Sequence, residues 1–279
     1  MLRAPAKLNL GLYVGRARDD GLHELRSLFC PLALADRIVI EPAEGEADEV
    51  VCEGVVGPNL VALALEALRA RGWESEPLRV TVEKVIPVAA GLGGGSADAG
   101  AVLRHLARER DDLQVIAAGL GADVTSQLEP RMALVGGAGE RVEQLPSPGE
   151  FAVVLVPLEP GLAAGEVYAR ADHLGLGRDA AELEGLASRL REAASGGASP
   201  VDYAGILVND LQGAALSLRP EIGEALVALE EAGAARALVA GSGPTAFGLF
   251  GDIATADRAA SSMPPRFAHA IVTAPQRFL

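Results

Sequence analysis

Apolar and polar positions alternate along several short runs of the chain, and this pattern predicts strands. Residues 6–14 alternate leucine or valine with polar side chains, as expected for a strand with one face exposed to water. A hairpin is predicted where residues 132–135 and 141–145 flank Gly136 and Gly137. Further strands are predicted at residues 28–34, 37–41, 78–82, 151–157, 247–250 and 269–273.

Apolar residues at helical spacing predict helices between these strands. In the clearest one, residues 59–71, Asn59 is a good N-cap and Gly72 ends the helix. Further helices are predicted at residues 113–120, 166–173, 179–194, 221–232 and 254–262. Strands and helices mix without a regular β–α–β order, so we expect an α+β fold. The Pro/Ser/Gly cluster at residues 146–149 predicts a boundary between an N-terminal lobe, residues 1–148, and a C-terminal lobe, residues 149–279.

A glycine-rich run separates the predicted strand at residues 78–82 from another helical pattern. Four of the five residues 91–95 are glycine, and we expect Ser96 to cap the helix and Asp98 to lie in its first turn. Glycines let backbone N–H groups approach a phosphate closely, and a helix N-terminus adds partial positive charge. This density of glycine favours a phosphate-binding loop over a plain turn.

Better-known phosphate loops fit the run poorly. A P-loop requires Lys and then Ser or Thr after its last glycine, whereas Ser96 and Ala97 follow Gly95. A Rossmann loop requires a third glycine where Ser96 stands, and an acidic residue that ends a second strand. The His-Arg-Asp and Asp-Phe-Gly motifs of protein kinases are missing from the sequence.

Composition narrows the class of protein. The chain has 279 residues, of which 49% are hydrophobic, enough for a sizeable core. A net charge of −14 argues against a nucleic-acid or anionic-membrane surface. The sequence shows no bilayer-spanning apolar run and no signal peptide, so we expect a cytoplasmic protein. Cys30 and Cys52 fit neither a metal pattern nor a disulfide framework, and no metal site is predicted.

Three separated segments together resemble the motifs of the GHMP small-molecule kinase superfamily: residues 6–10, 87–97 and 241–247. Within it, three more segments resemble the branch that phosphorylates a cytidine-bearing isoprenoid precursor: Asp-Gly-x-His-x-Leu at 20–25, Gly-Ala-Asp-Val at 121–124 and Asn-Asp-Leu at 209–211. The resemblance covers essentially the whole chain in the same order. It implies a two-lobed GHMP kinase fold with the active site between the lobes.

The resemblance also implies roles for individual residues. Lys7 and Asp123 are the implied catalytic pair, in which the carboxylate takes the proton of the acceptor hydroxyl. ATP with Mg²⁺ is the implied co-substrate, and no tightly bound cofactor is expected. The implied ATP-binding residues are Asn59, Pro87, Val88, Ala89, Ala90, Gly91, Leu92, Gly93, Gly94, Gly95, Ser96 and Ala97. The implied substrate-binding residues are Asn9, His23, Phe29, Tyr168, Gly241, Ser242 and Gly243, with Phe29 and Tyr168 flanking the base.

Each of these residues also has an ordinary structural interpretation. Taken alone, Lys7 reads as an exposed lysine on an edge strand, and Asp123 as the cap of a turn or short helix. Asn9 either contacts substrate or holds its strand in place. For Asn209 and Asp210, capping the following helix is the favoured interpretation.

The chain departs from the family pattern at Leu22, Thr125, Ala164 and Ala240, where the family usually has Tyr, Pro, Thr and Ser or Thr. Leu22 removes an aromatic side chain from the expected base site, so phosphoryl transfer is the firmer expectation and the acceptor the weaker one. One alternative is a related kinase of homoserine, mevalonate or a sugar. The other is a non-catalytic nucleotide or metabolite sensor, which has no need of Lys7 and Asp123. The expected partner is a small molecule, with the chain a monomer or weak homodimer.

Overall fold

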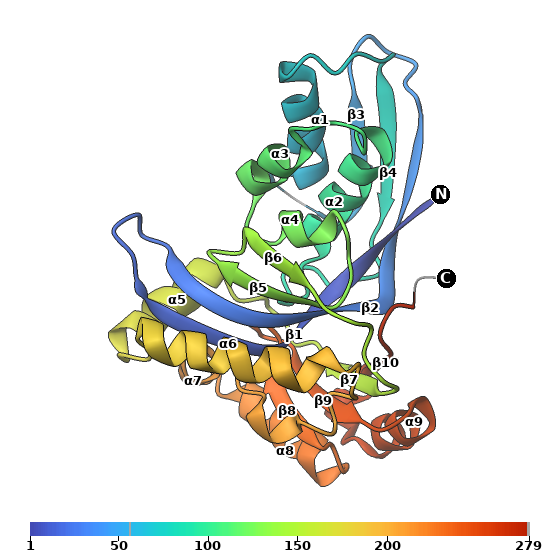
Figure 1. Ribbon diagram of the computed structural model, residues 1–279. Coiled ribbons are helices and arrows are strands. Elements are labelled where there is room, and N and C mark those ends of the chain that lie inside the picture. Colours follow the sequence, from blue (N-terminus) through green and yellow to red (C-terminus); the bar gives the residue numbers. More distant parts are fainter. Residues whose placement is uncertain (56, 278–279) are drawn as a thin grey trace.

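Two sheets, each covered by helices, make up the molecule in the computed structural model, which describes residues 1–55 and 57–277 (Figure 1). The first sheet has the order β3-β4-β2-β5-β6, with β1 paired to β2. Its strands are β1 (Leu2–Ala17), β2 (His23–Pro42), β3 (Glu49–Cys52), β4 (Leu78–Glu83), β5 (Ala133–Gly137) and β6 (Arg141–Gln144). The second sheet has the order β10-β7-β9-β8, with strands β7 (Ala152–Val156), β8 (Arg236–Val239), β9 (Ala246–Phe250) and β10 (Ile271–Thr273).

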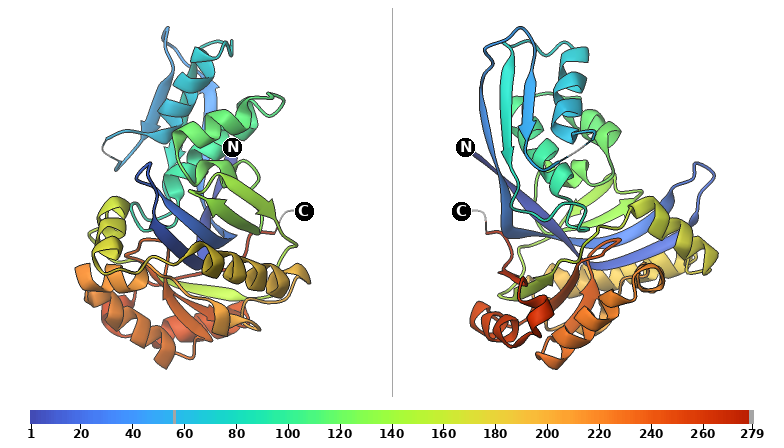
Figure 2. Two further views of the ribbon diagram at one scale, coloured as in Figure 1. Left: turned by 60° about the vertical axis from the view of Figure 1, so that its left-hand side comes forward. Right: turned by 180° about the vertical axis from the view of Figure 1, so that it is seen from behind.

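The helices divide between the two sheets (Figures 1 and 2). On the first lie α1 (Leu60–Ala70), α2 (Gly94–Leu106), α3 (Leu113–Leu120) and α4 (Val124–Gln127). Beyond β7 follow α5 (Ala164–His173), α6 (Ala180–Ser195), α7 (Gln212–Leu218), α8 (Glu221–Glu231) and α9 (Ile253–Ser262). Short 3₁₀ turns occupy Ala204–Ile206 and Pro265–Phe267. Helix α6 follows β7 in the chain but packs against β1, β2 and β5 of the first sheet.

The long β1–β2 hairpin connects the two halves of the molecule. Both faces of β1 are buried from Ala4 to Val14, so the prediction that one face is exposed to water is wrong. The reason is tertiary: α2 contacts one part of β1, while α6 and the second sheet cover the rest. One hydrophobic core joins Leu8 of β1 to Phe151 and Phe247, across the predicted lobe boundary at residues 146–149. That boundary stays a prediction.

Most predicted elements are confirmed, as is the α+β class. Asn59 caps α1 through its side chain, whose Oδ1 accepts from the Val61 N–H at 2.8 Å, and β5 and β6 pair as the predicted hairpin. Residues 28–34 and 37–41 are not separate strands but parts of the single long β2, which is irregularly paired to β1 at several bulges. The apolar pattern did not predict β3, β8, α4 or α7, all of seven residues or fewer.

The start of α2 differs from the prediction. The N-cap is Gly93, in the left-handed region at φ +66°, so Ser96 is already the third helical residue and does not cap. Asp98 lies beyond the first turn and pairs with Lys84 instead of the helix N-terminus. The chain enters the helix early because glycine adopts the left-handed conformation at little cost. The backbone N–H groups of Gly94, Gly95 and Ser96 thereby have no partner within the helix, which begins with the bond from Ala97 N–H to Gly93 O.

The sequence predicted neither a membrane-spanning segment nor a metal site, and the structure describes residues 1–55 and 57–277. In that part of the chain, no helix combines the length and hydrophobicity needed to cross a bilayer. The same residues contain no cluster of three or more His, Cys, Asp or Glu side chains arranged to hold a metal ion. Cys30 and Cys52 are free thiols.

Candidate active site

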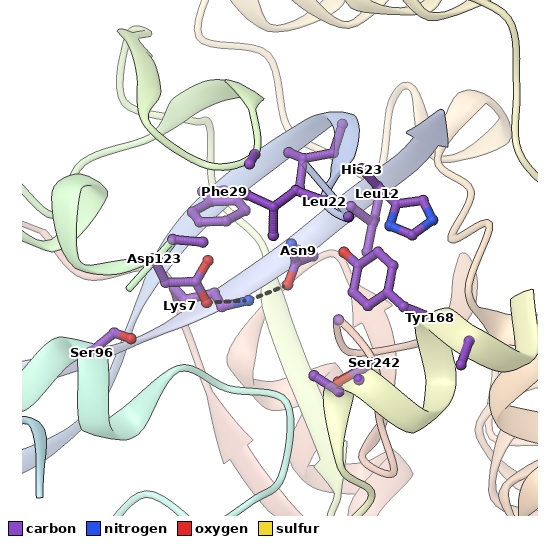
Figure 3. Close-up of a pocket in the computed structure, with 18 of the residues that line it drawn as sticks. Lys7, Asn9, Leu12, Leu22, His23, Phe29, Ser96, Asp123, Tyr168 and Ser242 are labelled. Carbon is purple, nitrogen blue, oxygen red and sulfur yellow. Dashed lines mark hydrogen bonds and ion pairs between the residues drawn. The ribbon is translucent and has the colours of Figure 1, made fainter. Parts of the chain in front are cut away.

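A buried lysine lies at the centre of the site (Figure 3). Lys7, on β1, is 6% exposed, and its Nζ lies 3.1 Å from Asp123 Oδ2. The same ammonium donates to Asn9 Oδ1 at 2.6 Å and lies 4.9 Å from the centroid of the Phe29 ring. A buried ammonium requires such compensation, since an unpaired buried charge is costly. The exposed-lysine interpretation of Lys7 is therefore wrong.

Neighbouring elements hold the partners of Lys7 in place. Asp123 is the N-cap residue of α4, but its side chain makes no capping bond and points to Lys7 instead. Asn9 Nδ2 donates to Ser27 Oγ at 2.8 Å, and the Ser27 hydroxyl donates to Gly11 O at 2.7 Å. This chain of bonds fixes the Asn9 amide so that Oδ1 faces the ammonium. Asn9 thus does hold its strand to β2.

The glycine-rich loop packs directly on this centre. The backbone N–H of Lys7 donates to Leu92 O at 3.0 Å. A Cβ added to Gly93 would lie 2.8 Å from Lys7 Cγ, and one added to Gly91 would lie 2.2 Å from Ala240 O. Glycine is required at both positions because the backbone approaches its neighbours so closely. The loop, β1 and the turn at Gly241 therefore form one tightly packed unit.

Two cavities flank this unit. The first, of about 330 Å³, is lined by Lys84, Asp98, Asn59 and every predicted loop residue except Ala97, which is buried. The second, of about 530 Å³, is lined by Lys7, Asp123 and all the predicted substrate residues except Gly243. Ser96 lines both cavities. The structure thus brings nearly all the predicted site residues to two adjoining spaces.

Beneath the loop lies a buried charged cluster that the sequence analysis did not identify. Lys84 Nζ pairs with Asp98 Oδ2 at 2.8 Å and also with Asp36. Asp36 Oδ1 accepts from the backbone N–H groups of Val85 and Ile86, at 2.6 and 2.8 Å. Asp98 Oδ1 is buried without a partner. Burial raises the pKa of Asp98 to about 7, with Lys84 opposing the shift and Asp36 adding to it.

The far end of the second cavity is aromatic. The His23 and Tyr168 ring centroids lie 5.0 Å apart at an interplanar angle of 37°, and Figure 3 shows the two rings side by side. Burial raises the pKa of Tyr168 to about 12, and the charge of Asp123 acts in the same direction, so the phenol keeps its proton at neutral pH. Phe29, 4% exposed, faces Lys7. Leu22, 52% exposed, also lines this cavity.

Neither Asn209 nor Asp210 is the N-cap residue of the following helix, although Asn209 Oδ1 accepts from the Leu211 N–H, just before that helix, at 2.9 Å. The N-cap of α7 is Leu211, without a side-chain cap, because the helix begins only at Gln212. Asn209 Nδ2 instead donates to Val239 O and Gly241 O, both at 2.7 Å, and so fixes the turn that faces Lys7. Asp210 pairs with Arg178 and accepts from the Val14 N–H.

Comparison with known proteins agrees with this arrangement. Residues 59–128 match the GHMP kinases N terminal domain, and residues 181–269 match the GHMP kinases C terminal domain. A 4-diphosphocytidyl-2-C-methyl-D-erythritol kinase from Streptomyces coelicolor is 41% identical over 257 residues, which cover 88% of this chain and 85% of the relative. The enzyme of that name from Novosphingobium aromaticivorans is 40% identical over 274 residues, covering 94% and 88%.

Solved structures extend the comparison to the fold. A crystal structure of 4-(cytidine 5'-diphospho)-2C-methyl-D-erythritol kinase has a TM-score of 0.78 at 34% identity and covers 99% of both chains. Homoserine kinase from Cytophaga hutchinsonii has a TM-score of 0.72 at 18% identity, covering 99% of this chain and 93% of its own, and so shares the fold. The predicted GHMP kinase fold is confirmed. By sequence and structure, the chain belongs to the 4-diphosphocytidyl-2-C-methyl-D-erythritol kinase family of the GHMP kinases.

Proposed function

We propose that this chain transfers the γ-phosphoryl group of ATP to the 2-hydroxyl of 4-diphosphocytidyl-2-C-methyl-D-erythritol, a step in non-mevalonate isoprenoid synthesis. The observation that carries the proposal is the position of the Lys7–Asp123 pair. It lies in the second cavity, against the loop that lines the first, with Ser96 shared between them. The acceptor assignment is supported by the name that the relatives share.

The nucleotide phosphates bind at the glycine-rich loop. The N–H groups of Gly94, Gly95 and Ser96 have no partner within α2, and Ala97 makes its first helical bond. Free N–H groups at the N-terminus of a helix of 13 residues favour an anion. Gly91 and Gly93, with φ of +78° and +66°, shape the backbone that surrounds it.

The chemistry follows from the centre of the site. The acceptor oxygen forms a bond to the γ-phosphorus, and the bond from that phosphorus to the ADP oxygen breaks. Asp123 accepts the proton of the hydroxyl, which makes the oxygen a better nucleophile. The Lys7 ammonium, 3.1 Å from that carboxylate, orients it and offsets the charge of the transferring group.

Mg²⁺ binds together with ATP. Magnesium commonly binds one or two protein oxygens besides substrate phosphates. Ser96 lies next to the loop and lines both cavities, and its hydroxyl fits this requirement. When bound, the ion neutralises phosphate charge during transfer.

The cytidine end of the acceptor lies against Tyr168 and His23. Figure 3 shows both residues across Asn9 from Asp123, which separates base recognition from the reacting hydroxyl. The flat face of Tyr168 suits a pyrimidine ring. Phe29 packs beside Lys7, and its predicted role as the second wall of the base site stays a prediction.

The test is release of ADP by the purified protein with ATP, Mg²⁺ and each of three acceptors. We expect turnover with 4-diphosphocytidyl-2-C-methyl-D-erythritol and almost none with homoserine or mevalonate. Turnover confined to homoserine or mevalonate would agree with a GHMP kinase but would show that the proposed acceptor is wrong. ATP binding without turnover of any acceptor would favour the non-catalytic sensor. Asp123→Asn serves as the control for a contaminating kinase.

A further inference from the structure

A hydrogen bond joins the two walls of the acceptor cavity. His23, at the start of β2, places Nε2 2.8 Å from Oδ1 of Asp172, near the end of α5. Both residues line the cavity; the His23 side chain is 9% exposed and the Asp172 side chain 45%. The other nearby carboxylate, Glu24, is engaged by Arg26 and Arg141. Asp172 is therefore the carboxylate that contacts the His23 ring.

The bond determines which ring nitrogen carries the proton. A carboxylate accepts hydrogen bonds and does not donate, so Nε2 of His23 is the donor to Asp172. In a neutral imidazole the other nitrogen, Nδ1, then presents a lone pair. Over the described residues, no protein group donates to Nδ1 by hydrogen bond. The cavity thus contains a hydrogen-bond acceptor, His23 Nδ1, whose lone pair is fixed by the bond from Nε2 to Asp172.

The position of the ring gives this acceptor a use. His23 packs against Tyr168, with ring centroids 5.0 Å apart. A flat base lying on Tyr168, which lines the cavity, would have its polar edge beside the imidazole. Cytosine has an exocyclic amino group on that edge, which can donate to a lone pair. Uracil has a carbonyl oxygen at the same position, which would face Nδ1 lone pair to lone pair.

We propose that Asp172 is a positioning residue that fixes the tautomer of His23 and thereby makes the cavity select cytosine over uracil. The inference rests on the proposed function, because it assumes that the cavity receives a pyrimidine. It adds that base selection depends on a residue outside the sequence motifs. Leu22, which lines the same cavity, offers the base no ring to stack on, so more of the selection is left to this hydrogen bond.

The test is Asp172→Asn, a substitution of the same shape. An amide can donate to Nε2 as well as accept from it, so it no longer enforces one tautomer. We expect the KM for the cytidine acceptor to rise about tenfold, the scale of one hydrogen bond. The KM for ATP and kcat should stay unchanged. The ratio of the dissociation constants of UDP and CDP, measured by calorimetry, should fall by about the same factor.

The matched control is Glu166→Gln, which removes a carboxylate from the same helix. Glu166 is exposed and does not line the cavity, so the CDP preference should persist. A second readout is ¹⁵N NMR of His23: in the unmodified protein Nε2 should carry the proton and Nδ1 should not. In Asp172→Asn that assignment should become mixed or reverse.

The outcomes separate this inference from the proposed function. If the unmodified protein neither binds CDP nor phosphorylates the cytidine acceptor, both ideas are wrong. If it does both, and Asp172→Asn keeps its preference for CDP over UDP, only the role of Asp172 is wrong. A lower melting temperature with unchanged preference would likewise reduce Asp172 to a structural contact.

Discussion

The nucleotide side and the acceptor side of the site are built in opposite ways. The proposed nucleotide side is built mainly on one contiguous run, residues 87–96, in which the backbone makes much of the surface and glycine allows close packing. The acceptor side gathers side chains from separate elements: Asn9 on β1, His23 on β2, Tyr168 on α5 and Ser242 after β8. A backbone site tolerates little change at its glycines. A side-chain site can change one wall, as at Leu22, without touching the phosphoryl-transfer chemistry.

The largest effect is expected where the two sides meet. Asp123→Asn should lower kcat by about 10²-fold or more, because the amide cannot take the hydroxyl proton. The dissociation constant of ATP should hardly change. Steady-state kinetics and calorimetry on the same preparation measure both quantities. The exposed Asp111→Asn is the control, and a double Lys7→Ala, Asp123→Asn variant should be far from additive. Near-normal turnover of Asp123→Asn would exclude Asp123 as the base.

The backbone character of the nucleotide side is tested by Gly91→Ala. The added Cβ would lie 2.2 Å from Ala240 O, at a φ of +78° that alanine avoids, so the loop must move. Because a shift of about 1 Å can cost ~10²-fold, we expect the KM for ATP to rise by roughly tenfold to a hundredfold. Gly119→Ala, with nothing within 4 Å of its added Cβ, should leave ATP binding intact. Equal behaviour of the two variants would mean that the loop does not bind phosphate.

The side-chain character of the acceptor side is tested by Tyr168→Ala. Stacking of a base on an aromatic ring contributes about 1–3 kcal/mol, so the acceptor KM should rise by roughly tenfold to a hundredfold. The KM for ATP should remain the same, since the substitution is remote from the loop. Tyr168→Phe keeps the ring and should behave almost normally. An unchanged acceptor KM in Tyr168→Ala would remove this ring from the base site.

The smallest effect concerns the charged cluster under the loop. The pKa of Asp98 in the folded protein, about 7, lies above its ordinary value of 3.8 because the carboxyl is buried, so the folded state binds the proton more tightly. The contribution of Asp98 to stability therefore falls as pH rises from about 4 to about 7. Asp98→Asn removes that pH-dependent loss of stability. The gain in melting temperature should therefore be a few degrees larger at pH 8 than at pH 5, which corresponds to ~1 kcal/mol in the free energy of unfolding.

Asp36→Asn is the opposite control for this cluster. The Asp36 carboxylate accepts hydrogen bonds from two backbone N–H groups and pairs with Lys84. Replacing it should therefore destabilise the protein at both pH values. Thermal unfolding without nucleotide measures both variants. A pH-independent difference between Asp98→Asn and the unmodified protein would show that Asp98 is charged in the folded state throughout this range.

The same contrast explains what the sequence could and could not predict. The glycine-rich loop is local, so its glycines and the strand and helix around it were visible in the pattern. The Lys84 cluster was not, because Asp36 and Asp98 lie 48 and 14 residues from Lys84 and meet it only through packing of β2, β4 and α2. The bond between His23 and Asp172, 149 residues apart, was missed for the same reason. A charged residue is predicted to be exposed unless the sequence also shows which residue of opposite charge it pairs with.

The wrong predictions have a related cause. The capping roles of Ser96, Asn209 and Asp210 failed because helix starts depend on backbone conformation, which a local pattern places only to within a few residues. The prediction that one face of β1 is exposed to water failed because the second sheet and α6 cover that face. The acceptor residues themselves came from resemblance to a family, and no local rule would have joined Asn9 to Tyr168.

The most direct test of the account is ³¹P NMR of the product formed by the unmodified protein from ATP, Mg²⁺ and 4-diphosphocytidyl-2-C-methyl-D-erythritol. The account predicts a new phosphomonoester on the tertiary carbon at position 2, an intact cytidine diphosphate and one equivalent of ADP. A phosphate on any other hydroxyl, a cleaved diphosphate, or ADP released without a phosphorylated acceptor would contradict it.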